Sequence, residues 1–370
     1  MSRVGIVMPL AQQRGGAEWA LRRFLDGLPA ERRDGVALCF LEAGPMVEWS
    51  RDEGFPTAVV DAGRLRQPLS WARCVRELRR WLVANRIDVV LSWMAKAHLY
   101  AGPAAQLARI PAVWWQHGLP ANRGVDLLAT LIPARRILTC SNAVAAAQRR
   151  IWSQRAELTT IYPPVDLREV RTTPAQCVAR GRVGLPADRV VIGIAARLQR
   201  WKGVHVFVDA AARLVPKFDR LLFVVVGGTH ELEREYAAHV RARAVALGLE
   251  RHVLFAGHRD DALEWLAAMD IVVSASLAEP FGMAIVEAMA LGKPVVATKV
   301  AGPLEIVTDG VDGMLVEPGS ADELALALAA LIDAPDTRAR LGAAARARVE
   351  RYDVPRFVAE VTDSLREVAA

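Results

Sequence analysis

Two glutamates stand eight positions apart around a short loop that could bind an anion. Glu279 opens the segment E-P-F-G, and Glu287 lies within the apolar run that follows it. Gly282 lets the backbone approach a ligand closely, and a helix that starts at Met283 presents amides that lack intrahelical partners. A charge in an apolar helix is costly unless it binds something or reaches solvent. We therefore expect Glu287 to hold a ligand or to lie on a solvated helix face.

Two cations are expected beside this loop. Arg197 and Lys202 come directly after Val190–Ala195, a β-branched run that predicts a buried strand. Two cations and a helix N-terminus would together suit a diphosphate. The alternative is an ordinary pair of solvated surface cations.

The spacing of the two glutamates argues against a hydrolase pair. Glycosidase carboxylates stand about 5–9.5 Å apart across the bond that they cleave. Eight helical steps would separate Glu279 from Glu287 by roughly 12 Å. Two carboxylates at that distance could hold the hydroxyls at either end of one extended ligand, with the diphosphate between them. That is the shape of a nucleotide sugar.

These residues need a parallel sheet to position them. Ile271–Ala275 predicts a strand, Met283–Leu291 a helix and Pro294–Ala297 a second strand, which together make a βαβ crossover. Ligands of parallel α/β sheets bind beyond the carboxyl ends of the strands, where the E-P-F-G loop is expected.

The first half of the chain repeats this alternation. Val4–Met8 predicts a strand, and Gly15-Gly16-Ala17-Glu18 follows at the joint with a helix, where a phosphate or sugar could approach the backbone. His117 follows the strand expected at Ala112–Gln116. A glycine pair can also be a simple turn, and a loop histidine can be inert.

Pro163-Pro164 is the best candidate for a domain boundary, because paired prolines resist both helix and central strand. We expect an α/β protein with two doubly wound, Rossmann-like domains that face each other across a cleft. Their expected limits are 1–164 and 165–352, with 353–370 forming a terminal helix that crosses back to the first domain.

The net charge of +6 is unevenly spread. Residues 1–165 hold 22 Lys/Arg against 13 Asp/Glu, or +9, which leaves −3 for the remainder. A membrane surface or a phosphorylated acceptor would suit the basic half, and a compositional bias towards arginine would give the same count. The helix expected at Trp71–Ala84 could be interfacial or simply solvated. Basic residues are not interleaved with stacking aromatics, so nucleic acid is not an expected partner.

Several other classes are excluded by missing signals. No apolar run approaches the ~20 residues of a membrane span, and no signal-peptide layout precedes the first strand. We expect a cytoplasmic protein, free or peripheral to the inner face of the cell membrane. The four cysteines lack metal-ligand spacing and are expected to be reduced core residues. No P-loop and no G-x-G-x-x-G after the first strand are present.

Three motifs together resemble a known family. E-P-F-G-M-A-I-V-E (279–287), A-R-L-Q-R-W-K-G (196–203) and G-G-A-E (15–18) resemble the retaining glycosyltransferases of family 4, which have the GT-B fold. The resemblance extends through nearly the whole chain. The second motif usually opens with glycine, and the small Ala196 stands there instead.

The resemblance implies roles for the matching residues of the second half. Glu279 would hold hydroxyls of the donor sugar and Glu287 those of the ribose. Arg197 and Lys202 would neutralise the leaving diphosphate. Backbone amides would come from Phe281, Gly282 and Met283.

The resemblance also implies roles outside those motifs. Gly16 would lie against the diphosphate from the first domain, with Gly15 and Glu18 in the same turn. His117 would lie beside the reacting carbon. His258 and Arg259 fall where such proteins hold the nucleobase.

The expected reaction is transfer with retained configuration from a UDP-sugar, or second a GDP-sugar, to an unknown acceptor hydroxyl of a glycan, glycolipid or metabolite. No metal and no cofactor are expected, because Arg197 and Lys202 supply the positive charge. A nucleotide-sugar 2-epimerase and a non-catalytic sugar-nucleotide-binding subunit are the alternatives.

Overall fold

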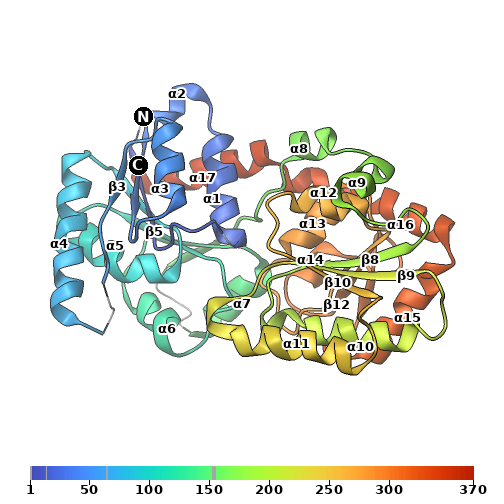
Figure 1. The fold of residues 1–370 in the computed structure, drawn as a ribbon. Helices are drawn as coiled ribbons and strands as arrows, with labels where there is room; N and C mark the ends of the chain where they lie inside the picture. Colours follow the sequence, from blue (N-terminus) through green and yellow to red (C-terminus); the bar gives the residue numbers. More distant parts are fainter. Residues whose placement is uncertain (1, 14, 64–65, 152–155) are drawn as a thin grey trace. The chain divides into compact units, whose positions relative to one another are not determined.

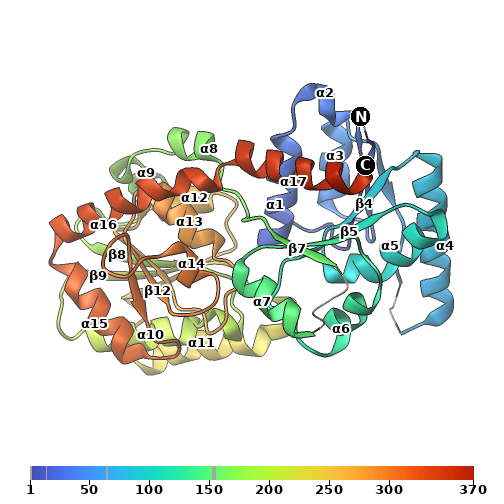
Figure 2. The same cartoon turned by 180° about the vertical axis from the view of Figure 1, so that it is seen from behind.

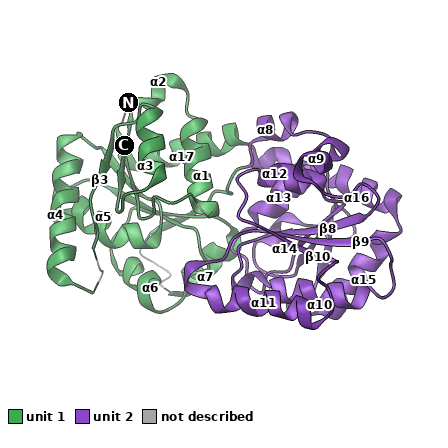
Figure 3. Ribbon diagram, in the orientation of Figure 1, with its two compact units in different colours: residues 1–164, 354–370 green, residues 165–353 purple. Residues whose placement is uncertain are grey.

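The chain folds into two compact units (Figure 3). The computed structural model describes residues 2–13, 15–63, 66–151 and 156–370. Unit 1 comprises Met1–Pro164 together with Val354–Ala370, and unit 2 comprises Val165–Asp353. Each unit is built on one parallel sheet with helices on both faces, which confirms the predicted α/β class with two doubly wound sheets.

The sheet of unit 1 has the strand order β3-β2-β1-β4-β5-β6-β7. All of its described pairings are parallel, and its central strands are buried apolar runs, as expected where helices cover both faces. The order reverses between β1 and β4, so the carboxyl ends of these two strands flank a switch point. The strands are β1 (Val4–Met8), β2 (Val36–Phe40), β3 (Thr57–Val59), β4 (Val89–Ser92), β5 (Ala112–Gln116), β6 (Arg136–Thr139) and β7 (Glu157–Thr160).

The helices of unit 1 form two layers around this sheet (Figures 1 and 2). Helices α1, α3 and α17 supply one apolar core, and α4, α5 and α6 supply the other. The C-terminal α17 belongs to unit 1, where Phe357 packs against Phe24 and Trp115 and Glu367 pairs with Arg136 at 2.7 Å. The helices are α1 (Gly16–Asp26), α2 (Ala30–Arg33), α3 (Pro45–Asp52), α4 (Pro68–Ala84), α5 (Ala95–Ala108), α6 (Gly124–Leu131), α7 (Asn142–Ile151) and α17 (Val354–Ala369).

The sheet of unit 2 has the order β10-β9-β8-β11-β12-β13. Its switch point lies between β8 and β11, the two strands whose following loops carry the expected cations and the E-P-F-G segment. The strands are β8 (Val190–Ala195), β9 (Leu221–Val226), β10 (Val253–Gly257), β11 (Ile271–Ser274), β12 (Val295–Thr298) and β13 (Met314–Val316).

The helices of unit 2 also form two layers, with α10, α11 and α15 on one apolar core and α9, α12 and α13 packed together elsewhere. The elements are α8 (Leu167–Thr172), α9 (Gln176–Val183), η1 (Arg200–Lys202), α10 (Val204–Leu214), η2 (Glu231–Glu233), α11 (Arg234–Ala246), α12 (Ala262–Ala268), α13 (Met283–Ala290), α14 (Pro303–Ile306), α15 (Ala321–Ile332), α16 (Pro335–Arg348) and η3 (Val349–Tyr352).

The segment 231–247 is not one continuous helix: η2 precedes α11, because His230 Nδ1 accepts the amide of Leu232 and Glu233 leaves the helical conformation at φ −132°. One expectation about the cysteines is wrong. Cys177 is exposed on α9 rather than buried, while the other three cysteines are core residues. Within the described ranges, no helix combines the length and the apolar character needed to cross a bilayer.

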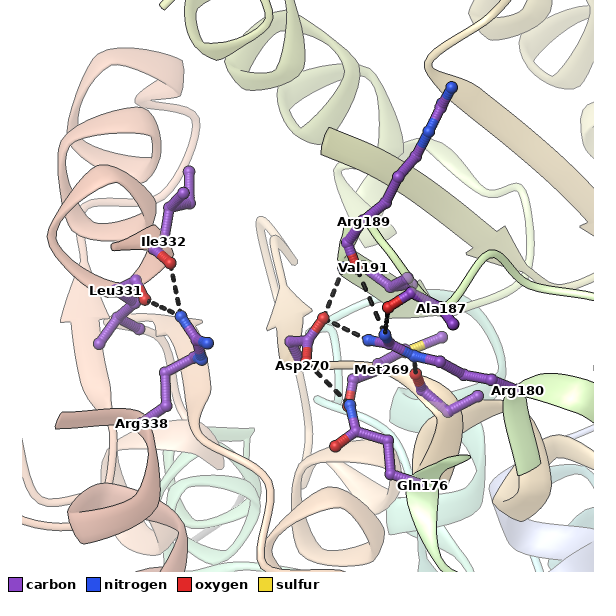
Figure 4. A network of polar contacts seen from close by, with 11 residues as sticks. Gln176, Arg180, Ala187, Arg189, Val191, Met269, Asp270, Leu331, Ile332 and Arg338 are labelled. Carbon is purple, nitrogen blue, oxygen red and sulfur yellow. Dashed lines mark hydrogen bonds and ion pairs between the residues drawn. The ribbon is translucent and has the colours of Figure 1, made fainter. Parts of the chain in front are cut away.

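A buried ion pair fixes the edge of the unit 2 sheet where β8 and β11 begin (Figure 4). Arg180 on α9 pairs with Asp270, which precedes β11, and also donates to the carbonyl of Ala268 at 2.9 Å. Asp270 in turn accepts the amide of Val191 at 2.7 Å and the side-chain amide of Gln176 at 2.8 Å. The carboxylate therefore ties α9, β8 and β11 together.

We expect Asp270→Asn to lower the free energy of unfolding by about 2–4 kcal/mol, because it leaves the buried Arg180 without its countercharge. Asp322→Asn is the matched control, since it removes the carboxylate from the exposed Arg213–Asp322 pair and should cost at most about 0.5 kcal/mol. Urea unfolding of both variants measures the difference. Equal losses would show that the network does not hold the sheet.

Candidate active site

Glycine at position 203 lets the loop after β8 touch the loop after β11. Gly203 has φ +67°, and a Cβ there would lie 1.8 Å from the carbonyl oxygen of Ala275. The amide of Leu277 donates to the carbonyl of Trp201 at 2.7 Å, which closes the same contact. The turn η1 is therefore pressed onto the start of the segment that leads to Glu279.

This contact brings Lys202 and Glu279 together. Lys202 Nζ lies 2.6 Å from Glu279 Oε2, and both side chains are largely buried. The hydroxyl of Ser276 donates to the same Oε2 at 3.1 Å. Thr298 in β12 holds Ser276 by donating to its carbonyl at 2.6 Å. Both described contacts of the carboxylate use Oε2, so Oε1 has no described protein partner and could accept from a ligand.

The start of α13 is shaped by two more glycines. Gly282 caps the helix at φ +119°, where a side chain would be strained. A Cβ on Gly302 would lie 2.2 Å from the carbonyl oxygen of Phe281, and the amide of Gly302 donates to the carbonyl of Glu279 at 3.0 Å. Phe281 is buried with its ring 5.6 Å from that of Tyr352. The amides at the start of α13, beginning with that of Met283, are thereby held in place.

Glu287 lies one turn into α13 and is half-buried. It is four positions after Met283, so the two residues share one face of the helix. Met283 and Ala284 are likewise partly exposed, while the opposite face is buried. Glu287 is therefore on the face that begins at the helix N-terminus, as its proposed role in ligand binding requires.

Arg197 follows β8 at the same edge of the sheet and is partly exposed. A Cβ on Gly227 would lie 2.0 Å from the carbonyl oxygen of Ala196, so the residue that follows β9 must be glycine for the backbone before Arg197 to pass. Among residues that the structure describes, none pairs with the guanidinium of Arg197. The group remains available to an anion.

Glu233 is a site-supporting residue that the sequence analysis missed. Its carboxylate accepts the amide of Arg200 at 2.7 Å and the side-chain amide of Gln199 at 3.4 Å, which fixes the first turn of η1 ahead of Lys202. The separation of Glu233 from Lys202 in the sequence does not predict this contact, because the contact joins the loops that follow β8 and β9. Gly227-Gly228 directly after a buried strand is the one signal that could have marked this edge.

The structure gives less support to a role in the candidate site for His258 and Arg259 than for Lys202 and Glu279. Both are exposed, and each pairs with its own neighbour: His258 Nε2 lies 3.4 Å from Asp260, and Arg259 lies 2.9 Å from Asp261. The hydrogen bond to Asp261 raises the pKa of Arg259. No described contact joins these two side chains to Arg197, Lys202 or Glu279. The nucleobase role of His258 and Arg259 stays a prediction.

In unit 1 the turn before α1 is built around a buried carboxylate. Glu18 is buried in the first turn of α1, and a Cβ on Gly15 would lie 2.9 Å from its Oε2. Helix α1 begins at Gly16, and Trp93 after β4 donates from Nε1 to the carbonyl of Ala17 at 2.8 Å. The turn is thereby tied to the end of β4.

Trp93 also connects this turn to His117. The imidazole of His117 lies 5.5 Å from the ring of Trp93 and is stacked on Trp115 at 5.0 Å. Its Nε2 is buried, and no hydrogen-bond partner for it is found in the described part of the chain. Burial lowers the pKa of His117 to about 3, so the ring is neutral at physiological pH. A buried ring nitrogen without a partner is suited to a ligand hydroxyl.

A fully buried histidine, His98, shows what a structural role looks like in the same unit. His98 is stacked on Trp114 at 5.4 Å, as His117 is on Trp115. Unlike His117, it has partners on both nitrogens, with Nε2 donating to the carbonyl of Ile132 at 3.3 Å and Nδ1 accepting from the hydroxyl of Ser92 at 3.2 Å. The sequence analysis had no means of separating the two.

We expect Gly203→Ala to lower the free energy of unfolding by about 2–5 kcal/mol, since it adds a clash with Ala275 to the strain of a positive φ. Gly184→Ala is the control, because Gly184 has φ +72° with open space around its Cβ position, and should cost only about 1–2 kcal/mol. Denaturant unfolding of both variants gives the comparison. If the two substitutions cost the same, the contact between the loops is not tight.

Protonation of His98 should destabilise the fold in acid. Burial lowers the pKa of His98 to about 4, so the stability it contributes is complete above pH 6.5 and is lost as the pH falls towards 4. Between pH 7.5 and 5.5 the wild type should lose about 1–1.5 kcal/mol through this group, and His98→Gln should not. Urea unfolding at the two pH values tests this. Identical losses in both proteins would contradict it.

Comparisons with known proteins match both halves of the chain. A family model described as glycosyl transferases group 1 matches residues 178–348, and one described as glycosyltransferase family 4 matches residues 14–169. A D-inositol 3-phosphate glycosyltransferase from Kribbella flavida is 31% identical over 354 residues, which covers 86% of this chain and 78% of the relative. One from Acidothermus cellulolyticus is 28% identical over 372 residues, covering 93% and 79%.

Solved structures share both units. The crystal structure of Anabaena HepE in complex with UDP and glucose matches with a TM-score of 0.88 at 27% identity, covering 99% of this chain and 100% of that one. Sucrose-phosphate synthase from Thermosynechococcus elongatus has the same fold, with a TM-score of 0.82 at 21% identity and coverage of 100% and 99%. The chain therefore belongs to glycosyltransferase family 4, has the GT-B fold and is an enzyme that transfers glycosyl groups.

Proposed function

We propose that this enzyme transfers a sugar from a nucleoside-diphosphate sugar to an acceptor hydroxyl with retention of configuration. The observation that carries the proposal is the buried Lys202–Glu279 pair at the switch point of unit 2, in the same loop region as Arg197, whose guanidinium pairs with no described residue. Buried charges at such an edge cost desolvation energy, and an anionic polyhydroxyl ligand would make use of them.

The donor would lie along the edge from Arg197 to the start of α13. Lys202 donates one of its three N–H groups to Glu279 and can give the others to the diphosphate. The amides at Phe281, Gly282 and Met283 would add neutral donors to phosphate and sugar.

The two carboxylates would bind the two ends of the donor. Glu279 Oε1 would accept a hydroxyl of the transferred sugar, since Lys202 and Ser276 occupy Oε2. Glu287 would accept the ribose hydroxyls. In unit 1, the unpartnered Nε2 of His117 would bind a sugar hydroxyl, and the amides at Gly15 and Gly16 would face phosphate oxygens.

In the chemical step the leaving diphosphate would itself act as the base. The bond between the anomeric carbon and the diphosphate oxygen breaks while the acceptor oxygen bonds to the same face of that carbon. A phosphate oxygen takes the acceptor's hydroxyl proton. Arg197 and Lys202 stabilise the charge that develops on the diphosphate, which is the role a metal ion would otherwise fill. Holding donor and acceptor in this geometry supplies much of the remaining rate enhancement.

The names of the relatives and of one solved structure suggest which donor and which acceptor to test first. UDP is the favoured nucleotide because the Anabaena structure contains UDP and glucose, and GDP is second. D-inositol 3-phosphate is the first acceptor to test, because the relatives carry its name. The basic balance of the first half of the chain would suit a phosphorylated acceptor. A cytoplasmic location stays a prediction.

We expect Lys202→Met to reduce transfer tenfold to more than a hundredfold, because it removes one or two charge-assisted contacts of about 1.5–3 kcal/mol each. Lys299→Met is the matched control, since it breaks the exposed Lys299–Glu317 pair in the same unit and should leave the rate unchanged. Nucleotide release from UDP-glucose in the presence of D-inositol 3-phosphate measures both. Thermal unfolding shows whether each variant is folded.

Two outcomes would contradict the proposal. Full turnover by a folded Lys202→Met variant would remove the assigned role of the lysine. Conversion of the donor into a different nucleotide sugar without acceptor would indicate a 2-epimerase instead. Retention itself is tested by the anomeric configuration of the product, and an inverted product would exclude the same-face mechanism.

A further inference from the structure

Five exposed residues form a stripe along the side of helix α4 that faces away from its sheet. At 100° per residue, Leu69, Arg73, Arg76, Arg80 and Val83 fall within an arc of about 80°. All five are exposed. The four buried residues of the helix are centred on the opposite side: Cys74, Val75, Leu78 and Leu82. We call these five exposed residues the α4 stripe; α4 runs along an outer side of unit 1 (Figures 1 and 2).

The charges of the α4 stripe are uncompensated. Helix α4 contains four arginines and one acidic residue, Glu77. Among the described residues, no carboxylate pairs with Arg73, Arg76 or Arg80, and Arg79 beside them donates only to the carbonyl of Leu107 at 3.2 Å.

Two exposed arginines on helices of unit 2 are paired instead. Arg213 pairs with Asp322, and Arg243 pairs with Asp209. The α4 stripe is distinguished by three arginines without a described carboxylate partner on one face of one helix, with exposed aliphatic residues at its two ends.

Apolar side chains flank these charges. Leu69 is 86% exposed, Val83 is 56% exposed, and Leu107 at the end of the neighbouring α5 is 61% exposed. The tryptophans of α4 do not share this surface, since Trp71 donates from Nε1 to the carbonyl of Leu99 and both Trp71 and Trp81 pack against the core below. The surface thus offers cations and aliphatic groups but no aromatic rings.

We propose that the α4 stripe docks unit 1 on an anionic phospholipid bilayer. Guanidinium groups bind phosphodiester oxygens through paired N–H donors, and an amphipathic helix can lie in the interface with aliphatic groups at the acyl boundary. From Leu69 to Val83 the helix spans roughly 21 Å, which allows all three arginines to reach headgroups at once. Nucleic acid fits less well, because single strands bind through stacking aromatics that this face lacks.

The proposal is independent of the donor site, because none of its residues lies in that site. Vesicle co-sedimentation tests it with the full chain. The protein should sediment with mixed phosphatidylcholine–phosphatidylglycerol vesicles and not with phosphatidylcholine alone, and high salt should weaken the binding. At roughly 1 kcal/mol per arginine, the triple variant R73Q/R76Q/R80Q should bind on the order of a hundredfold more weakly.

The matched control is R171Q/R220Q/R251Q, which changes the net charge equally at exposed positions of unit 2. It should bind like the wild type. Leu69→Ser should weaken the binding that survives at high salt, since it removes the apolar contact and no charge. Thermal unfolding confirms that each variant is folded.

Three results would overturn the proposal. The wild type could fail to sediment with anionic vesicles, or the two triple variants could lose binding equally. The stripe variant could also keep vesicle binding while losing an interaction with RNA or an acidic protein.

Discussion

The ion pair between Lys202 and Glu279 is the constraint on which the candidate active site of unit 2 depends. A buried ion pair is stable only with good geometry and further hydrogen bonds, and here Ser276 supplies one. The pair requires the loops after β8 and β11 to touch, which Gly203 permits by leaving room for the carbonyl of Ala275. The strand order therefore brings the two loops together, and the ion pair forms only because Gly203 lets them touch.

The opposite edge of the same two strands is fixed by a second ion pair. Asp270 stands before β11 and accepts the amide of Val191 in β8, while Arg180 neutralises it. The register of β8 against β11 is thus set at the edge where the strands begin. The edge where they end carries the Lys202–Glu279 pair of the candidate site. The structural ion pair and the ion pair of the candidate site thus lie at opposite ends of one strand pair.

In unit 1 two histidines differ in the hydrogen-bond partners of their ring nitrogens. His98 is satisfied on both nitrogens and stabilises the core, whereas His117 keeps a buried Nε2 without a described partner. On α4, Arg73, Arg76 and Arg80 likewise have no carboxylate partner among the described residues. In both cases a polar group without a described protein partner is the one that suggests an external ligand.

The sequence by itself determined the two parallel sheets and the positions of Arg197, Lys202 and Glu279 in loops that follow strands, because strand periodicity and residues that directly follow strands are local signals. It did not reveal the pairing of Lys202 with Glu279, nor the supporting roles of Ser276 and Glu233. These contacts join loops far apart in the chain, and only the order of strands in the sheet brings them together. Hydrogen-bond partners likewise separated His117 from His98, since partners on a ring nitrogen come from tertiary neighbours.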